Sequence, residues 1–346
     1  MKQTVVLGLS GGVDSAVAAR LLLEQGYGVV GLYLDIGPEG AGAEDAAAVA
    51  RRLSIPFQQW NIRPQLEREV CAPFAAAYRA GRTPLPCAVC NPRVKFPALL
   101  SAARQLGADY VATGHYARRG TGGDGRPLLL RGRPANDQSY MLARLSRETL
   151  QHVMFPLGDF EKRDVRALAG AEELPVADKP DSMEICFIPD GDYAAWLDGR
   201  DQGMPPGNFV DQEGHVLGRH QGIHHYTLGQ GRGLGVSGPH RYYVTAIRPE
   251  TNQVVLSDGS DLWADTVYGR DPNWIAVDGL EGPMEVSVRL RHSRSETAAT
   301  LLPGESGVLL RLHSPARAPT PGQLAVFYQG EIVVGSAWIS SPPAEG

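Results

Sequence analysis

Ser10-Gly11-Gly12-Val13-Asp14-Ser15 directly follows the apolar run Thr4-Val5-Val6-Leu7-Gly8-Leu9. The run predicts a buried strand of a parallel sheet, and the apolar spacing from 14 to 24 predicts a helix that stops near Gly26. Small residues at 10–12 let backbone N–H groups approach a ligand, and the helix start adds partial positive charge, so phosphate is the natural occupant. The GxxxxGK[ST] spacing used for γ-phosphoryl transfer is absent, together with its lysine. A tight strand-to-helix connection without a ligand is the alternative.

Strand-like and helical runs alternate from residue 1 to about 115, which predicts an α/β fold with a doubly wound parallel sheet. Further strands are expected at 28–34, 57–62 and 109–113, helices at 45–53, 64–80, 93–106, 136–145 and 157–174, and a proline-interrupted loop at 81–92. Ligands of such sheets bind at the carboxyl ends of the strands. The nucleotide pocket is therefore expected at Gly8, Leu9, Ser10, Gly11, Gly12, Val13, Asp14, Ser15, Leu34 and Gly114.

The chain becomes rich in glycine and proline beyond residue 200, with short strand-like runs. These runs are expected at 208–210, 216–217, 242–247, 254–256, 285–290, 307–312, 324–328 and 332–334. Short strands separated by turn signals indicate small sandwiches or barrels, and there is room for two. We therefore expect domains at 1–200, 201–270 and 271–346, with a loose tail from Ser340.

Composition describes an ordinary globular protein, with 346 residues, 43% hydrophobic and 21% charged. No membrane span or signal peptide is recognisable, so a cytoplasmic location is expected. The net charge of -5 argues against indiscriminate nucleic-acid binding. Two basic groups predict either local RNA-binding surfaces or solvated faces: Arg118, Arg119, Arg126, Arg131 and Arg133, and Arg289, Arg291, His292 and Arg294.

Cysteines are few: Cys71, Cys87, Cys90 and Cys186. In a reducing compartment, the CxxC pair at 87–90 suggests metal or sulfur chemistry rather than a disulfide. It could bind zinc together with Cys186, or these could be three unrelated thiols.

Six segments together resemble the tRNA-uridine 2-sulfurtransferases, also called tRNA-specific 2-thiouridylases. They are Ser10 to Ser15, Cys90-Asn91 with Lys95-Phe96, Thr113 to Ala117, Asp137 to Tyr140, Asp181-Ser182 with Ile185 to Ile188, and Tyr226 to Gln230 with Gly233 to Gly235. The first segment also resembles the pyrophosphate loop (PP-loop) of N-type ATP pyrophosphatases, which have the adenine nucleotide alpha hydrolase fold. The resemblance covers nearly the whole chain, in order.

The resemblance implies ATP-dependent replacement of O2 by sulfur at the wobble uridine, position 34, of the tRNAs for lysine, glutamate and glutamine. ATP would adenylate O2, with Mg²⁺ assisting and Asp14 capping the helix or orienting the metal. Cys186 would receive a persulfide and Cys90 would act with it. Both thiols should have pKa values lowered by nearby charge or helix ends, for which Arg93 and Lys95 are candidates, although both could instead contact tRNA phosphates. Expected tRNA contacts are Leu85, Pro86, Cys87, His115, Asn136, Asp137, Gln138, Arg289, Leu290 and Gln323.

Cys87 departs from the family pattern, because better-known members have aspartate there. Cys87, Cys90 and Cys186 could instead hold a [4Fe-4S] cluster whose fourth iron binds sulfide. Two mechanisms stay open, persulfide relay and cluster-bound sulfide, with the cluster slightly preferred. The sulfur donor would be a cysteine desulfurase, a sulfur-relay protein or inorganic sulfide.

Three other functions compete with this interpretation: a ligase or amidotransferase that adenylates a small metabolite, a non-catalytic RNA-binding protein stabilised by zinc, and a 4-thiouridine synthetase. The cysteines and the β-rich region would have no evident role in the first. The last normally has an extra RNA-binding module ahead of the loop, and none is recognisable here. We expect core or turn positions, rather than metal or base binding, for His224, His225, Trp263 and Trp274.

Overall fold

The computed structural model describes residues 2–37, 42–133, 135–181, 185–188, 190–201, 204–292, 295–304 and 307–342. Ser182 of the expected Asp181-Ser182 pair, Arg294 of the second basic group and the last four residues of the expected tail lie outside these ranges. Within the described part of the chain, no helix combines the length and the apolar character needed to cross a membrane.

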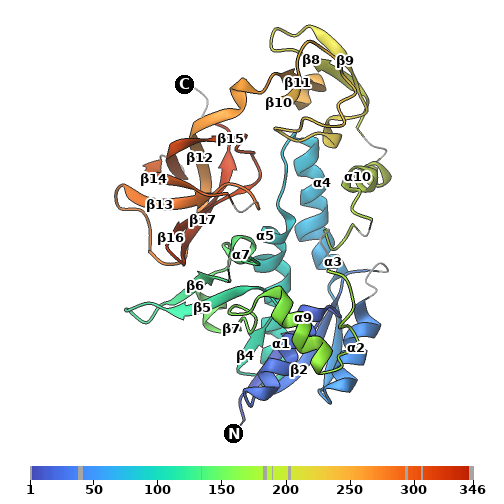
Figure 1. Ribbon diagram of the computed structural model, residues 1–346, viewed down its shortest axis with the longest axis vertical. Helices are drawn as coiled ribbons and strands as arrows, with labels where there is room; N and C mark the ends of the chain where they lie inside the picture. Colours follow the sequence, from blue (N-terminus) through green and yellow to red (C-terminus); the bar gives the residue numbers. More distant parts are fainter. Residues whose placement is uncertain are drawn as a thin grey trace.

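The N-terminal part contains the predicted parallel sheet, built from five strands (Figure 1). Its order is β3-β2-β1-β4-β7, from β1 (Thr4–Gly8), β2 (Gly28–Asp35), β3 (Phe57–Asn61), β4 (Tyr110–Ala112) and β7 (Val153–Met154). All four neighbouring pairs are parallel. The order reverses between β1 and β4, and at such a switch point the loops after the two strands diverge to form a ligand crevice.

Helices cover both faces of this sheet, as the doubly wound prediction requires. One face packs against α1 (Val13–Glu24), α2 (Gly42–Arg52) and α9 (Lys162–Ala171), and the other packs against α6 (Phe96–Leu106). Each fully buried Val, Leu or Phe contributes about 1.5–3 kcal/mol, so these two layers fix the crevice in place.

The expected loop at 81–92 was wrong in its second half, because residues 86–90 are helical. The remaining helical elements of this part are α3 (Arg63–Leu66), η1 (Glu67–Cys71), α4 (Ala72–Arg79), α5 (Pro86–Cys90), η2 (Asn91–Lys95), α7 (Ser139–Leu142), α8 (Arg147–Gln151) and α10 (Tyr193–Asp201). Pro86 lies in the first turn of α5, where proline has no needed N–H to lose and its fixed φ favours a helix start. The expected helix at 136–145 is reduced to the single turn of α7.

The middle part is a four-stranded sheet with its own core, drawn at the top of Figure 1. Its order is β10-β11-β8-β9, from β8 (Gly207–Val210), β9 (Val216–His220), β10 (Tyr243–Arg248) and β11 (Gln253–Ser257), with the 3-10 turns η3 (Ile223–His225), η4 (Pro249–Thr251) and η5 (Ser260–Leu262). Phe209, Val244 and Val254 are fully buried in this core.

The C-terminal part is an eight-stranded sheet in the order β12-β15-β14-β13-β16-β17-β6-β5, and a β12–β17 pairing closes part of it into a barrel. Its strands are β12 (Trp263–Trp274), β13 (Met284–Arg289), β14 (Thr297–Gly304), β15 (Gly307–Arg317), β16 (Leu324–Gln329) and β17 (Ile332–Ser340), joined by the hairpin β5 (Ala117–Thr121) and β6 (Pro127–Arg131). The two β-rich units were predicted, but β12, β14 and the β5–β6 hairpin were not. The hairpin connects this sheet to the nucleotide-binding part, since Leu130 of β6 pairs with Ile332 of β17.

Candidate functional site

The loop between β1 and α1 is tightly held, and its shape depends on glycine. Gly11 has φ +75°, and a Cβ there would collide with the carbonyl oxygen of Gly42. Ser15 Oγ accepts from the backbone N–H of Ser10 at 3.1 Å and donates to the carbonyl of Gly12 at 3.0 Å. Gly12 is the N-cap of α1 and has no side chain to cap it. The N–H groups of the first turn are therefore available to an anion such as pyrophosphate.

The loop after β4 packs directly on this phosphate loop. A Cβ on Gly114 would lie 3.0 Å from the backbone of Asp14 and Ser15, so the two loops meet at the switch point as expected. His115 follows, with its Nδ1 2.7 Å from Thr113 Oγ1 and its ring stacked near Phe96. Burial, with a smaller effect of the Lys95 charge, lowers the pKa of His115 well below its ordinary value. The imidazole is therefore neutral at physiological pH.

Asp14 does not cap its helix, contrary to one of its two expected roles. Its carboxylate instead accepts from Lys162 Nζ at 2.7 and 2.8 Å and from the Tyr116 hydroxyl at 2.7 Å. Lys162 also pairs with Asp181 at 2.7 Å. Burial and the hydrogen bond to Asp14 raise the pKa of Tyr116, so this hydroxyl stays a donor.

A second lysine reaches the phosphate loop from the same downstream region. Lys179 Nζ donates to the carbonyl of Gly11 at 3.0 Å and to Asp45 at 2.5 Å. Lysine is absent from the phosphate loop itself, but Lys162 and Lys179 bring two positive charges beside it. We did not predict them from the sequence, although Lys162 opens a predicted helix and Lys179 immediately precedes the family-like segment at Asp181.

Cys87 and Cys90 lie on α5, and the π-helical turn η2 follows at once. Such turns inside helices are often found at functional sites. Both cysteines are half-buried, and Cys186 retains exposed surface although the surrounding chain desolvates its thiol. Cys90 and Ile185, the residue before Cys186, pack against one hydrophobic cluster, and the Cys186 thiol lies within electrostatic range of Cys90, Lys95 and Cys87.

The expected lowering of the thiol pKa values was wrong. Burial raises the pKa of Cys90, and burial together with the neighbouring Cys90 raises the pKa of Cys186 to about 11. Lys95 opposes both shifts, so it supplies the expected positive field. Arg93 instead pairs with Glu69 at 3.6 Å. The fourth cysteine, Cys71, is buried, and burial raises the pKa of its thiol to about 12.

Zinc ligation by these cysteines is not supported by their spacing. Sulfurs on one tetrahedral zinc lie about 3.8 Å apart. Over the described ranges, no cysteine belongs to a group of three ligands whose atoms lie within 4.8 Å of one another. Three neighbouring cysteine thiols remain a donor set of the chemical type that holds an iron–sulfur cluster.

The residues expected to contact tRNA fall into two structural groups, one around Asp137 and Gln138 and one where Gln323 meets the segment ahead of α5. Asp137 accepts from Arg289 Nη1 at 2.7 Å in a buried ion pair, and Gln138 Oε1 accepts from the backbone N–H of Tyr116 at 3.0 Å. Gln323 Nε2 donates to the carbonyls of Thr83 and Pro84, at 2.9 and 3.3 Å, just ahead of α5. The C-terminal sheet thus holds the segment that carries Cys87 and Cys90. Of the others, Asn136 and Leu85 are half-buried, while Pro86 and Leu290 are buried.

The first basic group is largely neutralised by partners. Arg118 pairs with Glu331, Arg126 with Asp124 and Asp278, and Arg131 with Glu296. It is therefore an interface between the hairpin and the C-terminal strands rather than a free face. Trp274 packs near Phe327 as expected, while Trp263 is 57% exposed and lies at the end of the η5 turn, so its position is a turn rather than the core.

Three family models match consecutive parts of the chain. They are described as the tRNA methyl transferase HUP domain (residues 3–190), the tRNA methyl transferase PRC-barrel domain (198–258) and the aminomethyltransferase beta-barrel domain (264–339). A protein named tRNA-specific 2-thiouridylase MnmA from Heliobacterium modesticaldum is 46% identical over 98% of this chain and 93% of its own length. One of the same name from Moorella thermoacetica is 44% identical over 97% and 99%. A solved 4-thiouridine synthetase–RNA complex with bound ATP aligns with a TM-score of 0.35 at 17% identity, covering 57% of this chain and 50% of that one, too weakly to inform the site.

Proposed function

The chain belongs to the tRNA-specific 2-thiouridylase family, and from that membership we propose that it thiolates the wobble uridine of the tRNAs for lysine, glutamate and glutamine. ATP-dependent thiolation of tRNA uridine is the activity that the family supports. The domain descriptions mention methyl transfer, but the full-length relatives carry the thiouridylase name. A metabolite ligase or a non-catalytic RNA-binding protein is not favoured.

One arrangement carries the proposed assignment of the site: Lys95 ends the turn that follows Cys90 and lies within electrostatic range of His115 and of the Cys186 thiol. His115 adjoins Gly114, which touches the phosphate loop. We therefore propose that the thiols lie near the place where ATP would present its α-phosphate. We propose the nucleotide contacts at residues 8–15, Leu34 and Gly114.

Chemistry at this place takes two steps. The uracil O2 attacks the α-phosphorus of ATP, the bond to the bridging oxygen breaks, and pyrophosphate leaves into the phosphate loop with Lys162 and Lys179 beside it. Mg²⁺ would neutralise the phosphates, and Asp14 is its proposed ligand. Sulfur then attacks C2 of the uracil and AMP leaves. The base must leave its stack to reach the nucleotide.

Sulfur delivery has two routes. In the persulfide route, the Cys90 thiolate attacks the inner sulfur of a Cys186 persulfide, which releases hydrosulfide and leaves a Cys90–Cys186 disulfide for an external thiol to reduce. A cysteine desulfurase or a sulfur-relay protein would load Cys186. In the other route, Cys87, Cys90 and Cys186 hold a [4Fe-4S] cluster, which would supply a site for inorganic sulfide. Both routes use free cysteines, which fit a cytoplasmic enzyme.

The proposed domains divide the work between chemistry and RNA binding. Residues 1–200 would carry out catalysis, while 201–270 and 271–346 would hold the tRNA. The proposed tRNA contacts near the base are Leu85, Pro86, Cys87, His115 and Asn136 to Gln138, with Gln323 from the C-terminal sheet. Arg289 and Leu290 are buried, so we propose that they support this surface from behind.

Cysteine variants test the function directly. We expect Cys90→Ser and Cys186→Ser each to abolish 2-thiouridine formation but to keep tRNA-dependent release of pyrophosphate from ATP, because the phosphate loop is untouched. Cys71→Ala is the matched control and should keep both reactions, since Cys71 lies in the core. Thiolation that survives in either serine variant removes that cysteine from the mechanism.

The same assay on anaerobically purified Cys87→Asp separates the two sulfur routes. Persulfide relay predicts that neither the wild type nor the variant binds iron and that the variant retains thiolation. A cluster predicts about four irons per wild-type chain, with both iron and activity lost in the variant.

A further inference from the structure

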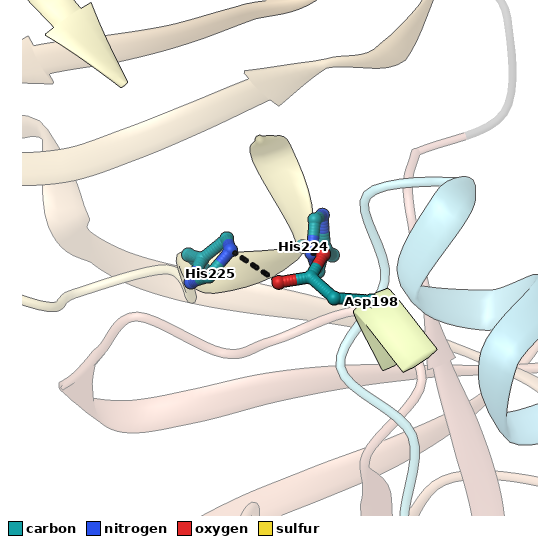
Figure 2. A group of neighbouring side chains, drawn as sticks. All are labelled: Asp198, His224 and His225. Carbon is teal, nitrogen blue, oxygen red and sulfur yellow. Dashed lines mark hydrogen bonds and ion pairs between the residues drawn. The ribbon is translucent and has the colours of Figure 1, made fainter. Parts of the chain in front are cut away.

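A second group of ligand-type side chains lies away from the cysteines, where α10 meets η3 (Figure 2). His224 Nε2 lies 2.7 Å from Asp198 Oδ1, and His225 Nε2 lies 3.4 Å from Asp198 Oδ2. The two imidazole rings are adjacent, with centroids 4.3 Å apart. Each residue offers one ligand atom, and the three atoms lie within 4.8 Å of one another.

Two imidazoles and a carboxylate are a donor set suited to a transition metal ion. Zinc binds imidazole nitrogen and carboxylate oxygen at about 2.0–2.2 Å, which places its ligand atoms about 3.3–3.5 Å apart. The observed spacings of 2.7 and 3.4 Å differ from this by less than an ångström. Asp198 is 43% exposed and His225 is 24% exposed, so water can supply a fourth ligand.

Buried His224 provides an independent observation. It is 1% exposed, and its Nδ1 has no hydrogen-bond partner among the residues that the structure describes. When a histidine ligates a metal through Nε2, its proton resides on Nδ1 and usually binds a backbone carbonyl. Gly222 keeps the space beside this nitrogen open, since a Cβ there would lie 2.8 Å from His224 Nδ1 and 2.9 Å from the carbonyl oxygen of Met204. The two atoms therefore flank one small space.

We propose that Asp198, His224 and His225 bind a divalent transition metal ion, with Zn²⁺ as the best match. The ion joins α10 to the η3 turn of the middle part. Trp196 of α10 packs against Phe187 at 5.3 Å between ring centroids, and Phe187 directly follows Cys186. The metal thus anchors, through one helix, the segment that carries Cys186.

Cobalt titration of the metal-free chain tests this site. Co²⁺ bound to nitrogen and oxygen ligands gives visible d–d bands without the near-ultraviolet charge-transfer band of cobalt thiolates, so the cysteines are distinguished. We expect one such Co²⁺ per chain, displaced by Zn²⁺. Asp198→Asn and His225→Gln should each weaken binding roughly tenfold or more.

The exposed group Asp211, Glu213 and His215 supplies the matched control. His215→Gln should bind Co²⁺ as the wild type does. A wild-type spectrum that shows only thiolate ligation, or equal affinity in Asp198→Asn, His225→Gln and wild type, overturns the proposal. Both variants change partly exposed side chains, and their thermal melts without metal should match the wild type. Added Zn²⁺ should raise the melting midpoints of the wild type and of His215→Gln by the same amount, and those of Asp198→Asn and His225→Gln by less.

Discussion

Lys95 ends the π-helical turn that follows Cys90, and its ammonium group favours the thiolate of both Cys90 and Cys186. Burial nevertheless keeps the pKa of Cys186 at about 11, so below that pH the thiolate fraction rises about tenfold per pH unit. In the persulfide route, Lys95→Met should raise both pKa values further. We expect single-turnover thiolation at neutral pH to fall roughly tenfold, the effect of one pKa unit, and its pH profile to move toward higher pH.

Arg93 is the control for this charge. It lies in the same turn, its side chain is 68% exposed, and it pairs with Glu69. Arg93→Gln removes an equal charge, so it should change the KM for tRNA and leave the pH profile in place. A profile that moves equally in both variants would trace the effect to tRNA binding, and one that moves in neither would mean that free thiolates are not the reacting species.

At the scale of elements, α9 positions Lys162 against the phosphate loop. Without Lys162, the site would lose one positive charge beside Asp14 and the polyphosphate of ATP. We expect Lys162→Met to slow tRNA-dependent pyrophosphate release roughly 100-fold, the order of one lost electrostatic contact to a reacting group. Arg163→Gln, one residue along and 79% exposed, should have no effect. Wild-type pyrophosphate release in Lys162→Met would exclude the lysine from the nucleotide site.

The sequence predicted those elements that local patterns determine. The strand, loop and helix from Thr4 to Glu24 were predicted because apolar spacing and small residues suffice there. Lys162 and Lys179 were missed because they reach the loop from the far end of the domain, and local sequence patterns do not predict such a long-range contact. The β5–β6 hairpin was interpreted as a basic group, because it joins a larger sheet only through the pairing of β6 with the distant strand β17. Helix α5 was missed because Pro86 was interpreted as a breaker.

At the scale of the whole molecule, the nucleotide sheet and the C-terminal sheet share one core. Val6 and Leu99 from the first pack in the same cluster as Leu324, Val326 and Val333 from the second. Hydrogen bonds reinforce the joint: the Tyr140 hydroxyl donates to the carbonyl of Leu324 at 3.0 Å, and Ser336 Oγ donates to that of Ala143 at 2.9 Å. The middle sheet keeps its own core around Phe209.

This division predicts two calorimetric unfolding transitions rather than three. The middle sheet, residues 204–257, should unfold separately with about 40 kcal/mol, at roughly 0.7 kcal/mol per residue. ATP should raise the midpoint of the larger transition alone, because it binds the folded nucleotide sheet.

Val326→Ala, in the C-terminal strand β16, should lower the midpoint of that same transition by several degrees, since it opens a cavity worth about 2 kcal/mol in the shared core. Val254→Ala should lower only the smaller one. If Val326→Ala lowered the midpoint of a transition that ATP does not shift, the two sheets would unfold as separate units. Gln323 would then not hold the cysteine segment within a single packed unit.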